Sequence, residues 1–141
     1  MTDMGNLQRL FQRASLSNEN DRGPLLEHPE WLVLSDRGVR ERRTRVAVGE
    51  QNVQVGFATY LVSDDVAELE DLFVDPQWMR RGIGRALVMD ISARLSELRF
   101  ETLEVTANPH AMPFYENLGF VEIGTVDTQL HPAPRMRRPT G

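Results

Sequence analysis

The sequence contains no cysteine among its 141 residues, and this absence removes several kinds of chemistry. A disulfide framework, a thiolate metal site and a cysteine nucleophile are all excluded. We expect no bound metal. Because disulfides do not persist in reducing compartments, a chain without them also fits a cytoplasmic protein, which is the location that we expect.

Long apolar runs are lacking as well. No run approaches the roughly 18 residues that a membrane-spanning helix requires, so we expect no membrane partner. The first ten residues, MTDMGNLQRL, do not place a basic region before an apolar one. This pattern argues against a secretory signal.

The sequence has fewer positively than negatively charged residues, with 16 Lys and Arg against 21 Asp and Glu, so the net charge is −5. That balance does not favour a nucleic-acid partner. The length and a charged fraction of 26% predict one globular domain over residues 1–141. The arginines nevertheless gather around residues 40–45, 80–85 and 135–138. Each gathering is either a solvated face or a local anion site.

The first part of the chain is predicted to be mainly helical. Leu7, Leu10 and Phe11 recur at helical spacing, which predicts a helix over residues 4–14. The turn-forming stretch SLSNENDRG is expected to end this helix. After it we predict a short helix in PLLEHPEWL, with Pro24 in its first turn, and a short strand in WLVLSD.

The remainder alternates between strand and helix patterns. Three antiparallel strands are predicted first, in RTRVAVGE, NVQVGFATYLV and VAELEDLFVDP. Then follow a helix in RGIGRALVMDISARLSEL, a strand in ETLEVTAN, a helix in AMPFYENLGF ended by Gly119, and a strand in FVEIGTVDT. RMRRP is interpreted as a last strand at the edge. This order predicts an α+β (mixed α/β) fold with one parallel crossover.

Two glycines, Gly82 and Gly84, stand among arginines where a helix is about to begin. The first turn of a helix has unpaired N–H groups and a positive dipole end, and glycine lets a ligand approach the backbone. The pattern therefore indicates either a phosphate cradle or a plain glycine-containing loop. A Walker loop is excluded because no Gly-Lys-Ser/Thr follows, and Leu87 does not fit a dinucleotide fingerprint.

Two segments, LFVDPQWMRRGIGRALV and NPHAMPFYENLGF, carry a family resemblance. The first places Val-Asp-Pro before Gly82 and Gly84. The second combines Asn108, Ala111, the Phe114-Tyr115 pair and Leu-Gly-Phe. Both segments, in this order, resemble the signatures of the GNAT superfamily of acyl-CoA-dependent N-acetyltransferases. Met79 departs from the pattern, because the family has Gln or Arg there.

The resemblance implies a fold and a reaction. The fold would be a central mixed, mostly antiparallel sheet with a splayed parallel strand pair, flanked by helices. The reaction would move an acetyl group from acetyl-CoA to a primary amine by direct attack in a ternary complex. Tyr115 would protonate the leaving thiolate. The implied contacts to the cosubstrate come from Leu72, Phe73, Val74, Arg80, Arg81, Gly82, Ile83, Gly84, Arg85, Asn108 and Tyr115.

Three carboxylates are the candidates for the general base, and His110 is a weaker alternative. Glu70 and Glu68 are the leading pair, acting through water, and relatives that acetylate ribosomal proteins place a glutamate near Glu104. Each can equally be a solvated carboxylate. The acceptor is expected to be a small-molecule amine or a protein or peptide amine. Trp78 and Trp31 are interpreted as packing residues.

Two other functions compete with catalysis. One is a non-catalytic module with the same fold that holds acyl-CoA as a sensor, which Met79 favours and Tyr115 opposes. The other is a toxin acting on aminoacyl-tRNA, which the negative net charge opposes. A terminal edge strand carrying Arg135, Arg137 and Arg138 is expected to pair in a homodimer, or else to be protected by those charges as a monomer.

Overall fold

The computed structural model describes residues 4–141. Residues 1–3, which begin the stretch whose pattern argues against a secretory signal, lie outside the described part. The helices are α1 (Met4–Leu16), α2 (Glu19–Glu27), α3 (Arg37–Arg40), α4 (Ile83–Glu97) and α5 (Met112–Asn117). The strands are β1 (Thr44–Val48), β2 (Gln54–Ser63), β3 (Val66–Val74), β4 (Thr102–Thr106), β5 (Val121–Asp127) and β6 (Pro132–Pro139). Short 3₁₀ turns are η1 (Pro29–Leu32), η2 (Glu50–Asn52), η3 (Pro76–Trp78) and η4 (Pro109–Ala111).

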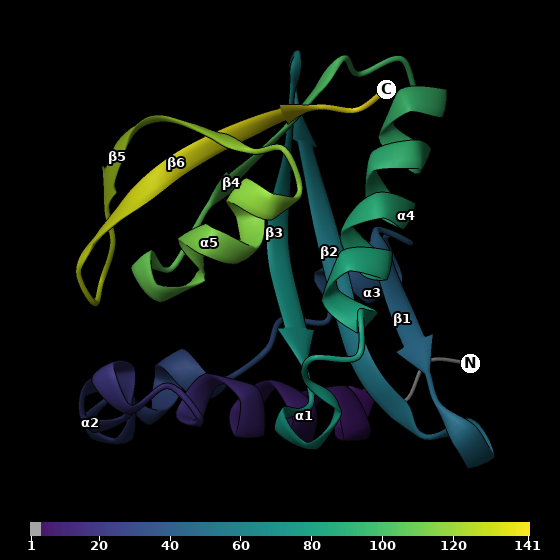
Figure 1. The fold of residues 1–141 in the computed structure, drawn as a ribbon. Coiled ribbons are helices and arrows are strands. Elements are labelled where there is room, and N and C mark those ends of the chain that lie inside the picture. Colours follow the sequence, from purple (N-terminus) through teal and green to yellow (C-terminus); the bar gives the residue numbers. More distant parts are fainter. Residues whose placement is uncertain (1–3) are drawn as a thin grey trace. The chain divides into compact units, whose positions relative to one another are not determined.

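The six strands form one sheet in the order β1-β2-β3-β4-β6-β5 (Figure 1). β3 and β4 run parallel, with Glu68 opposite Glu104 and Leu69 opposite Val105. The pairs β1–β2, β4–β6 and β5–β6 are antiparallel. The predicted mixed, mostly antiparallel α+β fold is thereby confirmed.

The described residues divide into two compact units. The first holds the residues up to Thr59 together with Asp71–Val88, and the second holds Tyr60–Glu70 together with Met89–Gly141. The expectation of a single domain over 1–141 stays a prediction.

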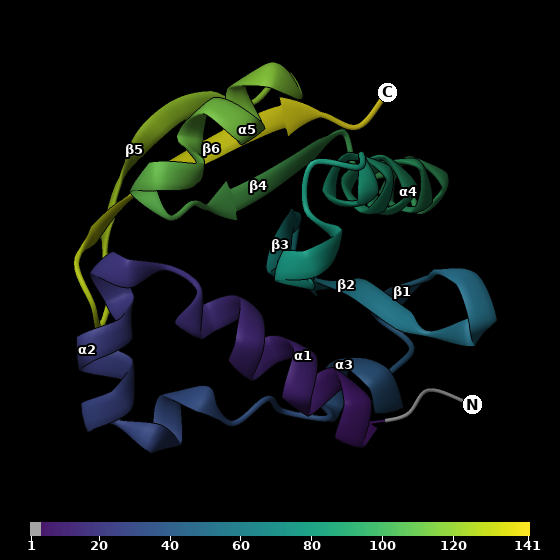
Figure 2. The same cartoon turned by 60° about the horizontal axis from the view of Figure 1, so that its bottom comes forward.

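The core of the first unit joins α1 to the strands. Leu7 and Leu10 on α1 and Phe57 on β2 are almost fully buried in one cluster, and Phe73 packs against it. The rings of Phe11 and Phe73 meet edge to face at 4.8 Å. The apolar stripe predicted over residues 4–14 therefore faces the strands of this unit (Figure 2).

The predicted strand at WLVLSD does not form. Residues 29–32 make a 3₁₀ turn, and no strand follows before β1 in the described chain. Gln8 on α1 explains the difference, because its Oε1 accepts from the Leu34 N–H at 2.8 Å and its Nε2 donates to the Leu32 carbonyl. These backbone groups are therefore satisfied by a side chain and need no neighbouring strand.

The second helix also starts earlier than predicted. α2 begins at Glu19, inside the stretch interpreted as turn-forming, and Pro24 is its sixth residue. The Asn18 carbonyl accepts from the Asp21 and Arg22 N–H groups at 3.1 and 3.0 Å. Glu19 and Asp21 lie in the first turn, where the helix dipole favours negative charge.

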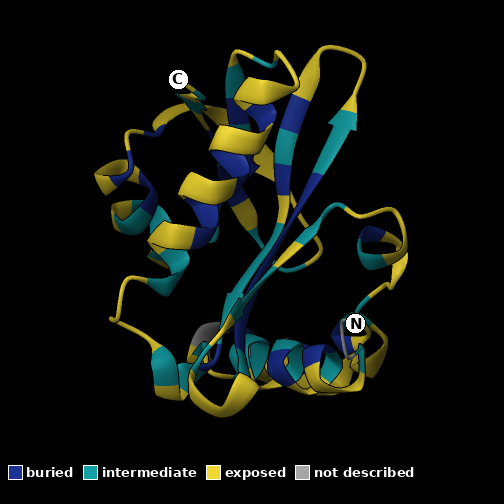
Figure 3. Ribbon diagram, turned by 90° about the vertical axis from the view of Figure 1, so that its right-hand side faces the viewer, coloured by how far each residue is buried: buried dark blue, intermediate teal, exposed yellow. Residues whose placement is uncertain are grey.

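The amphipathic pattern of α4 is confirmed. Leu87, Val88, Ile91 and Leu95 are buried along one side, while the other side is exposed (Figure 3). α5 ends at Asn117, and the predicted stop residue Gly119 follows the C-cap Leu118 with φ +90°. The Phe120 N–H donates to the Tyr115 carbonyl at 3.1 Å there, as in a glycine-terminated helix.

The expectation that the last strand lies at an edge is wrong. β6 pairs with β4 on one side and β5 on the other, and β5 is the terminal strand (Figure 1). Met136 is fully buried, whereas the arginines on either side of it point to the opposite face. The arginine–methionine alternation therefore belongs to an inner strand. No helix within residues 4–141 is long and apolar enough to cross a membrane. A cytoplasmic location stays a prediction.

Candidate active site

The loop between β3 and α4 is anchored by Asp75. The Asp75 N–H donates to the Val55 carbonyl at 2.8 Å, and its carbonyl accepts from the Trp78 N–H at 2.7 Å. Its carboxylate accepts from the Gln77 N–H at 3.1 Å and from Arg13 Nη2 at 2.6 Å. Asp75 is 8% exposed. Four contacts on one buried residue thus fix the start of the loop.

The end of the loop has an unusual backbone. Arg80 has φ +64° and Gly82 has φ +81°. A Cβ atom added to Gly82 would meet nothing within 4 Å, so the space above it is open. Of the two glycines singled out from the sequence, Gly82 has the left-handed conformation and Gly84 lies inside α4. The strained Arg80 could not be foreseen, because arginine has no preference for positive φ.

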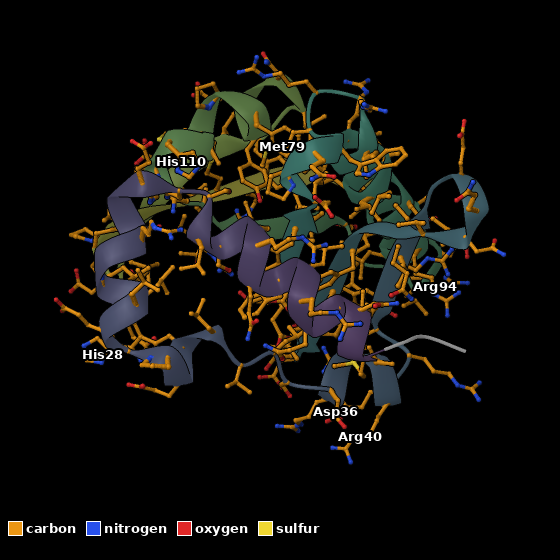
Figure 4. The ribbon with its side chains drawn as sticks, turned by 90° about the horizontal axis from the view of Figure 1, so that it is seen from below. His28, Asp36, Arg40, Met79, Arg94 and His110 are labelled. Atoms are coloured by element: carbon orange, nitrogen blue, oxygen red, sulfur yellow. The ribbon has the colours of Figure 1, made fainter. Side chains whose placement is uncertain are left out.

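The first turn of α4 follows at once. The Ala86 N–H donates to the Gly82 carbonyl at 3.0 Å and closes the first turn. By helix geometry, the amides of Ile83, Gly84 and Arg85 have no partner within the helix. Arg80, Arg81, Gly82 and Arg85 are exposed, and Figure 4 shows Met79 on the same loop. A positive helix end, three arginines and an accessible backbone therefore lie together.

The end of β3 also contributes predicted contacts. Leu72, Phe73 and Val74 are half-buried there. The Phe73 ring lies 5.6 Å from Phe57, so its side chain belongs to the core. A Cβ at Gly56 on β2 would come within 3.1 Å of the Phe73 carbonyl oxygen. Glycine at that position therefore lets the two strands approach closely. The backbone role of residues 72–74 stays a prediction.

Two of the three candidate bases lie together in the second unit. Glu68 and Glu104 are neighbours across the parallel pair β3–β4, and like charges on adjacent strands repel. Arg135 donates from Nη1 to Glu68 Oε2 at 2.7 Å and from Nε to Glu104 Oε1 at 3.0 Å. Arg137 donates from Nη2 to Glu104 Oε2 at 2.9 Å. Two arginines thus balance two carboxylates.

This arrangement changes the acidity of Glu104. Burial alone would raise its pKa, but the hydrogen bonds from Arg137 and Arg135 outweigh burial and hold the pKa of Glu104 below its usual value. A carboxylate with a lowered pKa is a weaker proton acceptor. Glu70 lies at an exposed position of β3. The base role of each of the three glutamates stays a prediction.

Asn108 and Tyr115 complete the predicted set. Asn108 precedes η4, and its Oδ1 accepts from the His110 N–H at 3.3 Å; the His110 side chain is labelled in Figure 4. The Tyr115 ring lies 5.1 Å from Phe114 and 5.3 Å from Phe120, both edge to face. Burial raises the pKa of Tyr115 well above its ordinary value. Its phenol therefore stays protonated at neutral pH.

Sequence reasoning missed the partners of these groups. Arg13, Arg135 and Arg137 make ion pairs with Asp75, Glu68 and Glu104. The alternation of arginine with Met136 was a signal for a strand with one charged face. Finding the carboxylates that share this face required the sheet order, because Glu104 and Arg137 are register partners 33 residues apart.

The comparisons with known proteins agree with this fold. Residues 33–129 match the family model described as "Acetyltransferase (GNAT) domain", and the chain belongs to this family. It is 26% identical over 136 residues to glucosamine 6-phosphate N-acetyltransferase of Trypanosoma brucei brucei, covering 85% of this chain and 92% of that protein. The protein is an acetyltransferase enzyme.

A second relative acts on a protein. The chain is 35% identical over 96 residues to the [ribosomal protein bS18]-alanine N-acetyltransferase of Escherichia coli K12, covering 66% of this chain and 64% of that one. A crystal structure of the ribosomal-protein-S18-alanine N-acetyltransferase from E. coli has a TM-score of 0.70 at 25% identity, over 100% of this chain and 90% of that one. The chain is also similar, in fold alone, to the crystal structure of PaiA N-acetyltransferase from Thermoplasma acidophilum in complex with coenzyme A. The TM-score is 0.70 at 16% identity, over 97% of this chain and 92% of that one.

Proposed function

We propose that the protein is an N-acetyltransferase that moves the acetyl group of acetyl-CoA to a primary amine by direct attack in a ternary complex. One observation carries the proposal. An open, positive-φ glycine lies at the start of α4, among exposed arginines, in a loop anchored by buried Asp75. Backbone amides at a helix N-terminus bind phosphate groups.

The residues of this loop fit the pyrophosphate of acetyl-CoA. A Cβ at Gly82 would occupy the space that a phosphate needs, and glycine leaves that space open. Arg80, Arg81 and Arg85 supply positive charge, and the amides of residues 80–85 supply donors. Backbone groups of Leu72, Phe73 and Val74, together with Asn108, would hold the pantetheine arm.

When bound, acetyl-CoA supplies an acetyl thioester. The chain must then stabilise negative charge on the acetyl oxygen, take a proton from the amine and give one to the departing sulfur. We assign the acetyl oxygen to the backbone N–H groups at the end of β3. We assign the proton for the sulfur to the Tyr115 hydroxyl, which burial keeps protonated.

The proton acceptor is assigned to the pair Glu70 and Glu68, acting through water. Glu104 is less suited, because Arg137 and Arg135 lower its pKa. Replacing each of the three by glutamine and measuring kcat against pH tests this order. We expect E70Q or E68Q to lower kcat by about 100-fold, within the range for general bases. An equal loss in E104Q alone would move the role to Glu104.

The acceptor is a primary amine on a small molecule or on a protein. The named relatives include one of each kind, a sugar-phosphate acetyltransferase and an alanine acetyltransferase. Acetyl-CoA is therefore incubated with glucosamine 6-phosphate, an N-terminal alanine peptide and a polyamine. Because the chain has no cysteine, a thiol-reactive dye reports only the thiol of released coenzyme A. If none of these amines causes release of the thiol, while coenzyme A still binds, the result would favour the acyl-CoA sensor.

A homodimer is a further part of this proposal, and we assign its interface to β5, because β5 and not β6 is the terminal strand on this side of the sheet. All seven residues of β5 are exposed, and Val121 and Ile123 expose 63% and 44% of their surface. An open edge strand can pair with a second copy. A register shift between Glu122 and Gly124 opposes such pairing. Light scattering at micromolar concentration distinguishes a dimer from a monomer, since a mass near 16.1 kDa excludes a stable dimer.

A further inference from the structure

Arg81 lies over the ring of Trp78. Its guanidinium carbon is 4.7 Å from the centre of the indole ring. A cation within about 6 Å of an aromatic face is attracted by the electrons of the ring. Trp78 ends the η3 turn, three residues before Arg81. The aromatic contact therefore lies inside the loop that precedes α4.

The position of Trp78 is fixed by close packing of its indole ring and by a backbone hydrogen bond. Gly49 lies between β1 and β2, and a Cβ added there would come within 3.1 and 3.3 Å of two atoms of the Trp78 ring. The same atom would lie 3.2 Å from Val55 Cγ1. Only glycine lets the indole approach the strands this closely. The Trp78 N–H also donates to the Asp75 carbonyl at 2.7 Å.

The contact restricts Arg81 and leaves hydrogen-bond donors of its guanidinium available. An arginine side chain loses conformational entropy when a ligand orders it. A guanidinium carries five N–H donors, so a contact with one aromatic ring leaves several of them for an acceptor. Arg81 is exposed, so these N–H groups can meet an anion. Part of the cost of ordering Arg81 is thus met before any ligand arrives.

We propose that Trp78 is a positioning residue, which holds Arg81 ready to bind a phosphate group of acetyl-CoA. The inference rests on the proposed function of the loop. It replaces the view of Trp78 as a packing residue only. The phosphate is either in the pyrophosphate or at the 3′ position of the ribose, because both offer the same acceptor oxygens.

The test measures the affinity for coenzyme A by calorimetry, together with KM for acetyl-CoA, kcat and the thermal midpoint. The variants are W78L, W78F, R81Q and the double variant W78L/R81Q. W31L is the matched control, since Trp31 stacks on His28 at 4.1 Å in the η1 region. Dephospho-coenzyme A, which lacks the 3′-phosphate, distinguishes the two phosphate sources.

We expect R81Q to weaken coenzyme A binding about tenfold and W78L about three- to tenfold, with a higher KM and little change in kcat. W78F keeps an aromatic face and loses less. The double variant should match R81Q, because Trp78 acts through Arg81. W31L should bind as the wild type does. If the effect of R81Q persists with dephospho-coenzyme A, Arg81 binds the pyrophosphate; if it disappears, Arg81 binds the 3′-phosphate.

Other results overturn the inference. Wild-type affinity in folded W78L, or losses that add in the double variant, would show that Trp78 does not act through Arg81. If W78L does not fold, the affinity of W78F for coenzyme A is compared with that of W31L. An equal loss of affinity in these two variants would show that Trp78 has a packing role only. A wild-type protein that binds no coenzyme A would instead contradict the proposed function itself.

Discussion

Arg13 and Asp75, which are 62 positions apart in the sequence, form an ion pair. The distance from Arg13 Nη2 to Asp75 Oδ2 is 2.6 Å. Arg13 belongs to the last turn of α1, where the helix dipole favours a cation. The side chain of Asp75 is 11% exposed and that of Arg13 51%. The first helix is thereby joined to the residue that anchors the loop before α4.

We predict that R13M loosens this loop. The variant leaves the buried Asp75 carboxylate with its Gln77 contact and no cation, and we expect the free energy of unfolding to fall by about 1–3 kcal/mol. Urea denaturation measures the loss. R9M is the control, because Arg9 bonds to Asn6 within α1 itself. Equal stability of R13M and R9M would show that the Arg13–Asp75 pair does not stabilise the fold.

Gly82 is the second test. Its φ of +81° disfavours any side chain, most of all a β-branched one, so G82V adds strain and also fills the open space above the backbone. We expect G82V to lose measurable binding of acetyl-CoA in calorimetry. G119A is a control for strain alone, since Gly119 also has a positive φ and ends α5. Binding by G82V at the wild-type affinity would refute the assignment of the loop.

Tyr115 gives a prediction about rate. Y115F keeps the ring packing against Phe114 and Phe120 and removes the hydroxyl. We expect kcat to fall about tenfold or more at neutral pH, with little change in acetyl-CoA affinity. Since burial raises the pKa of Tyr115, no loss of activity between pH 7 and 9 should arise from its ionisation. An unchanged kcat in Y115F would assign the proton to another group or to water.

The arginine–glutamate network predicts a pH dependence of stability. Glu104 has a lowered pKa in the folded state, so it binds fewer protons there than in the unfolded chain. Its contribution is present above its ordinary value of 4.5 and is lost as pH falls through the lower, folded-state pKa. We expect E104Q to reduce the free energy of unfolding at pH 7 by about 1–3 kcal/mol.

The difference between E104Q and the wild type should shrink as the pH falls below 4.5, because the wild-type carboxyl is then protonated. Urea denaturation at pH 7 and in acid measures both values. E122Q, which changes an exposed carboxylate on β5, is the control and should show little effect at either pH. A difference that stays constant into acid would contradict the role of the ion pairs.

Local pattern predicted many of the elements. The stripe of α1, the four-turn α4, the glycine end of α5 and β1 to β5 all followed from spacing and turn residues. The resemblance of two segments added the family, which residues 33–129 confirm. The short strand at 31–36 failed because Gln8, more than 20 residues away, satisfies the backbone there. A single-sequence pattern carries no record of such a distant partner.

The sequence by itself determined where the chain turns, which faces are apolar, and that Gly82 stands where a helix begins, because these properties depend on neighbours within a few residues. Only the tertiary structure decided that β6 lies inside the sheet, that Arg135 bridges Glu68 and Glu104, and that the pKa of Glu104 is lowered. The reason is physical: strand order and ion pairing join residues tens of positions apart, and a shift in pKa depends on the distances that result.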